Sequence, residues 1–121
     1  MLPAPNRLRE RSDFTSAVRS FGGCRAGSRL LVVHATSTGA RAGLPPRVGF
    51  VVSKAVGGAV VRNRTKRRLR ALVAQRLDGI PTSVDLVVRA NPPAGQASSR
   101  ELQQALDPLL RRVVKGLGGA A

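Results

Sequence analysis

Apolar residues along this chain occur either at helical spacing or in short continuous runs. Near the start, Phe14, Val18 and Phe21 recur at i, i+4 and i+7, which predicts a short helix that ends at a glycine pair. Two apolar, β-branched runs follow at 28–37 and 47–53, separated by a loop rich in glycine and proline. We therefore expect two antiparallel strands that form a hairpin with a long connection.

A second helix is predicted for about residues 59–77, where Gly57 and Gly58 let the backbone turn into it. Its apolar residues fall on one side of a helical wheel, which predicts that this side packs against the rest of the protein. The predicted packed side consists of Val61, Thr65, Leu69, Leu72, Val73 and Leu77.

The remaining third of the chain predicts a strand and a helix. Residues 84–90 (VDLVVRA) form an apolar run that the following Asn-Pro-Pro ends. Ser98 and Glu101 have the spacing of a capping box, and leucines at helical spacing follow them. Pro108 is expected to kink or split this last helix, because it removes a backbone hydrogen bond.

The predicted order is αββαβα, which indicates an α+β fold with two layers. A chain of 121 residues can build one such core, so we expect a single domain over residues 1–121. The ends, at about residues 1–6 and 116–121, are expected to be flexible.

The distribution of charge points to a polyanionic partner. The chain has 21 Lys and Arg against six Asp and Glu, a net charge of +15, and residues 62–70 (RNRTKRRLR) hold six cations without an acid. A merely solvated face usually mixes signs, yet no acid occurs from Gly57 to Leu77. The pattern therefore favours nucleic acid as the partner. The helical wheel places Arg62, Asn63, Lys66, Arg67 and Arg70 opposite the packed side, with Arg64 and Arg68 toward the flank.

The side chains that catalysis usually needs are scattered. The six acids form no close pair, His34 is the only histidine and Cys24 the only cysteine, so the sequence predicts neither a metal site nor a catalytic dyad. The lone thiol, the lack of an apolar run of about 20 residues and the lack of a signal-peptide pattern predict a cytoplasmic protein without a membrane partner.

Aromatic side chains, which often stack on RNA bases, are scarce here: the chain has three Phe and no Trp or Tyr. Phe14 is expected at the lip of the sheet, because its helix is short and its neighbours are polar. His34 lies on the same predicted strand face as Val32, where it is either a partly buried core residue or a flat ring offered to a base.

Three blocks of the sequence, NRLRERSDF, RVGFVVSKAVGGAVVRNRTKRRLR and VDLVVRANP, together resemble the protein component of bacterial ribonuclease P. The resemblance implies an α+β sandwich with a left-handed βαβ crossover. It implies that the protein binds a catalytic RNA and the 5′ leader of precursor tRNA, and promotes Mg²⁺-dependent endonucleolytic removal of the leader. The RNA subunit would carry the chemistry, Mg²⁺ would be bound mainly by the RNA partner and substrate, and no obligate protein partner is implied.

The resemblance also assigns residues to two surfaces. A cleft between the sheet and the first helix would hold the leader, although Val18 and His34 stand where the family often has aromatics. Two alternatives to a ribonuclease P subunit remain for the function: a non-catalytic RNA-binding or ribosomal protein, and a protein nuclease in its own right. The implied leader cleft consists of Phe14, Val18, Val32 and His34. The implied RNA-facing residues are Arg62, Asn63, Arg64, Lys66, Arg67, Arg68 and Arg70, with Lys54.

Overall fold

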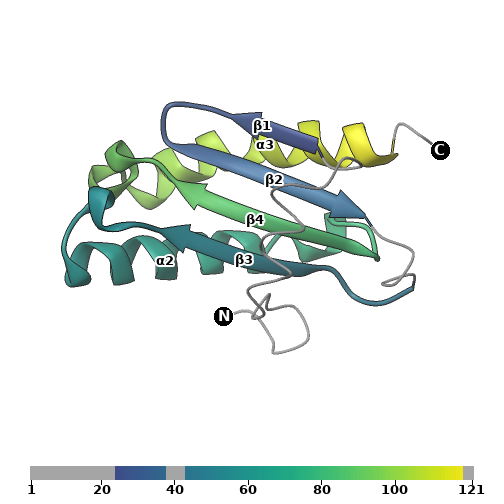
Figure 1. Cartoon of the computed structure of the whole chain (residues 1–121), viewed down its shortest axis with the longest axis horizontal. Coiled ribbons are helices and arrows are strands. Elements are labelled where there is room, and N and C mark those ends of the chain that lie inside the picture. Colours follow the sequence, from purple (N-terminus) through teal and green to yellow (C-terminus); the bar gives the residue numbers. More distant parts are fainter. Residues whose placement is uncertain (1–23, 38–42, 119–121) are drawn as a thin grey trace.

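The computed structural model describes residues 24–37 and 43–118 (Figure 1). The predicted first helix, with Phe14 and Val18, lies outside the described residues. Three short 3-10 helices connect the longer elements: η3 (Lys54–Val56), η4 (Leu77–Gly79) and η5 (Pro92–Gln96). The strands and α-helices are β1 (Cys24–Gly27), β2 (Leu31–Ser37), β3 (Arg47–Val52), α2 (Ala59–Ala74), β4 (Val84–Ala90) and α3 (Ser99–Gly118).

The strands form one mixed sheet in the order β1-β2-β4-β3. β2 is antiparallel to both β1 and β4, whereas β3 is parallel to β4. The predicted hairpin of residues 28–37 and 47–53 is therefore wrong, because β4 lies between β2 and β3. β4 is buried at six of its seven positions, as suits an inner strand, while β3 forms an edge with Val51 37% exposed. Two adjacent parallel strands need a crossover, and α2 provides it.

One strand was not predicted. β1 has the sequence CRAG, which contains no β-branched run, and it pairs with β2 through a tight turn in which the Ser28 amide donates to the Leu31 carbonyl at 2.8 Å. The described order after residue 23 is thus β1-β2-β3-α2-β4-α3, with one strand more than the predicted order contains.

The last helix begins as predicted but is not split. The Glu101 amide donates to Ser98 Oγ at 3.1 Å and the Ser98 amide donates to Glu101 Oε1 at 3.0 Å, which confirms the capping box. Pro108 lies inside a helix that continues to Gly118. Because both Pro108 and Gln104 are exposed, the carbonyl that loses its intrahelical partner can bind water instead.

Both helices cover the same face of the sheet, α3 behind β1 and β2 and α2 near β3 (Figure 1). The core lies between the two layers, and Leu31, Leu69, Leu86 and Leu102 are fully buried in it. Among the described residues, no helix combines the length and the apolar character that crossing a bilayer requires.

The predicted packed side of α2 is largely confirmed. Thr65, Leu69, Leu72 and Val73 are buried, and Val61 is half-buried against the core. The helix ends at Ala74 rather than at Leu77, and Leu77 begins the 3-10 turn η4 while still packing against the core.

Candidate nucleic-acid interface

The start of α2 depends on a glycine. Gly57 has φ = 155°, a backbone conformation that side-chain-bearing residues rarely adopt, and a Cβ there would lie 2.8 Å from Val61 Cβ. Gly58 follows as the N-cap, and its carbonyl accepts the Arg62 amide at 2.9 Å. The first turn of α2 contains no acid, so nothing there offsets the positive end of the helix dipole.

The outward side of α2 is a cationic surface. Asn63, Arg67 and Arg70 are exposed, and within the described part of the chain neither arginine has an acidic partner. Lys54, in η3 just before the helix, is exposed as well. The exposure of Asn63, Arg67 and Arg70 confirms the helical-wheel prediction that these residues lie opposite the packed side.

Arg62 and Lys66 do not lie opposite the packed side, and that part of the prediction is wrong. Both are half-buried, and Arg62 Nε is buried without a hydrogen-bond partner. Seven residues make almost two helical turns, so Arg62 lies nearly in line with the buried Leu69 and Lys66 with the buried Val73. Their long stems cover apolar surface at the edge of the packed side.

The opposite flank of α2 carries Arg64 and Arg68, as predicted, and both have partners. Arg64 Nη2 donates to the Gly95 carbonyl at 3.1 Å, and Arg68 Nη1 donates to the Ala97 carbonyl at 2.7 Å. Each guanidinium group has five donors, so each retains others for a second partner. The two arginines connect α2 to η5 and to the segment that leads into α3.

A second cationic surface lies on the sheet face that points away from α2 and α3. The register pairs Val32 with Arg89 and His34 with Arg25, and cross-strand partners share a face. Arg25 and Arg89 are both exposed. Sequence reasoning missed these two arginines. The alternation in VDLVVRA was a signal for Arg89, but nothing marked Arg25, because its strand was not predicted.

Of the predicted leader-cleft residues, the structure describes Val32 and His34. They are alternate residues of β2 on the outer sheet face, Val32 half-buried and His34 only 9% exposed. Burial lowers the pKa of His34 below its usual 6.5, and the positive charges of Arg25 and Arg89 lower it further. The ring is therefore neutral at pH 7, and its burial favours the first of its two predicted roles, a partly buried residue.

Two of the acids that the structure describes form ion pairs with arginines. Asp85 accepts two hydrogen bonds from Arg47, at 2.9 and 2.8 Å, across β3 and β4. Asp107 of α3 accepts from Arg76 just after α2. Their charges are thus neutralised locally, and the cations of α2 and of the outer sheet face keep their positive potential.

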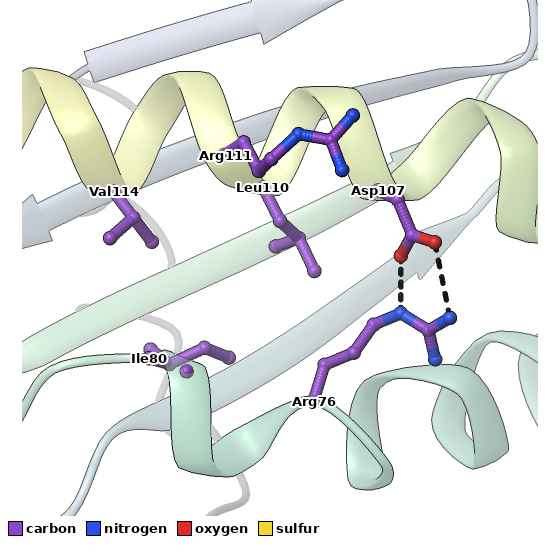
Figure 2. A pocket seen from close by; sticks show the side chains of 7 residues that line it. Arg76, Ile80, Asp107, Leu110, Arg111 and Val114 are labelled. Carbon is purple, nitrogen blue, oxygen red and sulfur yellow. Dashed lines mark hydrogen bonds and ion pairs between the residues drawn. The ribbon is translucent and has the colours of Figure 1, made fainter.

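A cavity of about 250 Å³ lies beside the ion pair of Arg76 and Asp107, between the end of α2 and the middle of α3 (Figure 2). No predicted site residue lines it. Among the described residues, no group of three or more His, Cys, Asp or Glu gathers that could hold a metal ion. The lining residues of the cavity are Arg76, Gly79, Ile80, Asp107, Leu110, Arg111 and Val114.

The fold and these surfaces define a small, basic α+β protein that presents an arginine-rich crossover helix to solvent. The Ribonuclease P family matches this sequence over residues 2–114. The chain belongs to the family of bacterial ribonuclease P protein components, the protein part of an endoribonuclease of tRNA processing. Membership in this family implies an RNA subunit as partner, and it decides against the alternative of a ribosomal protein.

Individual relatives agree with this assignment over nearly their whole length. The ribonuclease P protein component of Streptomyces griseus is 54% identical over 128 aligned positions, which cover 100% of this chain and 99% of the relative. That of Streptomyces bikiniensis is 52% identical and covers 96% of this chain. The solved RNase P protein of Staphylococcus aureus is 27% identical and superimposes with a TM-score of 0.78 over 90% of this chain and 97% of its own.

Proposed function

We propose that this chain binds the catalytic RNA of ribonuclease P through α2 and the 5′ leader of precursor tRNA through the outer face of its sheet, and that it thereby promotes Mg²⁺-dependent removal of the leader. The observation that carries the proposal is the outward side of α2. There the exposed Arg67 and Arg70 have no acidic partner among the described residues, and the first turn of the same helix is also free of acid. Such a surface is stable next to phosphates and self-repelling without them.

The RNA-facing residues differ in what they can offer. Arg67, Arg70 and Lys54 are exposed and can each neutralise a phosphate. Asn63 is exposed too, and its amide can hydrogen-bond a base edge or a 2′-hydroxyl. Arg62 and Lys66 can extend only their charged ends past the packed edge of the helix, and the buried Arg62 Nε already lacks a partner. Arg64 and Arg68 each use one amino group inside the protein.

The leader is assigned to the outer sheet face because a single strand needs both charge and flat apolar surface. Arg25 and Arg89 lie on β1 and β4, on either side of β2. Phosphates of the leader would meet these arginines, while bases would lie over the half-buried Val32, next to the largely buried, neutral ring of His34. Phe14 and Val18, outside the described residues, complete the cleft in the proposal.

Mg²⁺ and the hydrolysis itself are assigned to the RNA partner and its substrate. Within residues 24–37 and 43–118, no three His, Cys, Asp or Glu side chains come together that could hold a metal ion. The cationic surfaces reduce the repulsion between crowded RNA strands, which lets substrate and metal ions bind at lower Mg²⁺ concentration. The proposal includes the left-handed sense of the β3-α2-β4 crossover, a cytoplasmic location and no obligate protein partner.

The leader contact is tested by comparing precursor tRNA with mature-end tRNA in the reconstituted complex. We expect the leader to tighten binding and Arg89→Gln to remove most of that advantage while leaving leaderless binding unchanged. Arg112→Gln on α3 is the matched control, because it removes the same charge from an exposed site outside both surfaces. Equal affinity for the two substrates, with and without a leader, would contradict the assignment of the sheet face.

A further inference from the structure

We propose that Arg64 and Arg68 are positioning residues: their guanidinium groups hold the η5 segment against α2 and so fix the RNA-facing helix in place, rather than adding two more phosphate contacts. This inference rests on the proposed function, because it concerns the same helix. It separates the cations of α2 into those that meet RNA and those that set the position of the helix.

The first support is the pair of hydrogen bonds. Arg64 and Arg68 are one helical turn apart on the same flank, and they donate to the carbonyls of Gly95 and Ala97, which are two residues apart. Gly95 is buried and Ala97 is only 4% exposed. Carbonyls in such positions need a partner, and a charged donor is a strong one. The two arginines thus supply charged donors to the backbone carbonyls of two buried residues.

The second support is the close packing of the same junction. A Cβ on Gly95 would lie 2.5 Å from the Val56 carbonyl oxygen and 3.0 Å from Val61 Cγ1. The end of η5 therefore fits between η3 and the first turn of α2 with no spare room. In Figure 1 this junction lies at the end of the sheet where β3 leads through η3 into α2 and β4 leads through η5 into α3.

The consequence for RNA binding follows from this connectivity. The exposed Asn63 and Arg67 lie in the same two turns of α2 as Arg64 and Arg68. If the η5 segment is released, the first turns of α2 lose their polar anchor and keep only apolar packing, so the spacing of the RNA-facing groups is less well defined. Misplacing preorganised contacts weakens binding without changing how many phosphates are neutralised.

A phosphate contact and a positioning role are distinguished by how the affinity for RNA depends on salt. Each phosphate contact contributes about 0.7 to 0.9 to the slope of log affinity against log salt. We expect Arg64→Ala and Arg68→Ala each to weaken binding of the catalytic RNA about tenfold at every salt concentration, with the slope of the wild type. Arg67→Ala is the matched control from the same helix, and it should lower the slope by about 0.7 to 0.9. A lowered slope for Arg64→Ala, equal to that of the control, would overturn the proposal.

A charge-neutral substitution in η5 perturbs the same junction between η5 and α2. Gly95→Ala changes no charge, and it should weaken RNA binding with an unchanged slope, as Arg64→Ala does. Should Gly95→Ala not fold, Arg64→Lys serves instead, because a lysine restores a phosphate contact but lacks the planar fork and reach of arginine. Wild-type affinity in Gly95→Ala, or in Arg64→Lys, would count against a positioning role.

Amide hydrogen exchange in the free protein tests the anchor without RNA. The Ala97 amide caps the end of η5 and donates to the Ala94 carbonyl at 3.2 Å. It should exchange faster in Arg64→Ala and Arg68→Ala, and at the wild-type rate in Arg67→Ala. Unchanged exchange in all three variants would refute the anchor. Failure of the wild-type protein to bind the catalytic RNA would instead refute the proposed function and leave the exchange result as the test of the anchor.

Discussion

Replacing both Arg67 and Arg70 by glutamine removes two exposed cations from the outward side of α2 and nothing from its packed side. Neither side chain contacts an acid within the described part of the chain, so the change breaks no internal ion pair. The net charge falls from +15 to +13, and the fold should be retained. The expected defect is therefore confined to the RNA interface.

The magnitude follows from the number of phosphates that the two side chains can neutralise. Two contacts at about 0.7 to 0.9 each lower the slope of log affinity against log salt by about 1.4 to 1.8. Over a fourfold rise in salt, from about 50 to about 200 mM, wild-type affinity should then fall about tenfold more than that of the variant. The deficit of the variant is thus largest at low salt and shrinks as salt rises.

The assay is titration of labelled catalytic RNA with protein at several salt concentrations. The matched control is the double variant Arg111→Gln with Arg112→Gln, which removes the same net charge from exposed positions of α3. We expect its slope to stay close to that of the wild type, because only the location of the charge differs. Equal slopes for both double variants, or a wild-type slope for the α2 variant, would refute the assignment of α2 to RNA.

Three further predictions concern the core, the histidine and the leader. Leu69→Ala should lower the free energy of unfolding by about 2 to 5 kcal/mol in urea titrations, because Leu69 is fully buried. Val60 on the same helix is 78% exposed, so Val60→Ala should change the free energy of unfolding by no more than about 0.5 kcal/mol. A similar cost at both sites would contradict the packing. Because the pKa of His34 in the folded state lies below its usual 6.5, the unfolded chain takes up the proton first as pH falls, so stability should decline as pH drops through about 6.5 and level off below the folded-state pKa. This pH dependence should shrink in His34→Gln, and an identical profile would mean that other groups cause it. Phe14→Ala should cost about 1 to 3 kcal/mol of affinity for leader-bearing precursor if the ring stacks on a base, with catalytic-RNA binding kept, and an equal loss on leaderless substrate would place Phe14 in the core instead.

The elements with strong local patterns were predictable from the sequence. The period of apolar residues located α2 and its packed side, and the capping box located the start of α3. The sheet order was not predictable in this way. Strands adjacent in sequence usually pair, so residues 28–37 and 47–53 suggested a hairpin, but pairing of β4 with both β2 and β3 depends on contacts distant in sequence.

In the candidate site, too, features set by local sequence patterns were predictable, and features set by contacts distant in sequence were not. Arg67 and Arg70 were found from helical phase alone, because exposure on a helix follows from position. Arg62 was placed on the wrong side, because seven residues make almost two turns and bring it nearly in line with the buried Leu69. Arg25 and Arg89 become neighbours of His34 only through strand register. The partner of Arg64, the Gly95 carbonyl, lies 31 residues away in the short 3-10 helix η5, and no local pattern encodes this contact.

The most direct test of the account is cleavage of leader-bearing precursor tRNA by the catalytic RNA at low Mg²⁺, with and without this protein. We predict that the protein restores cleavage at Mg²⁺ concentrations where the RNA alone is nearly inactive, and that RNA-free protein alone cleaves nothing. Cleavage rates that do not respond to the protein would contradict the account. Cleavage by the RNA-free protein would contradict it in a different way, by favouring a protein nuclease.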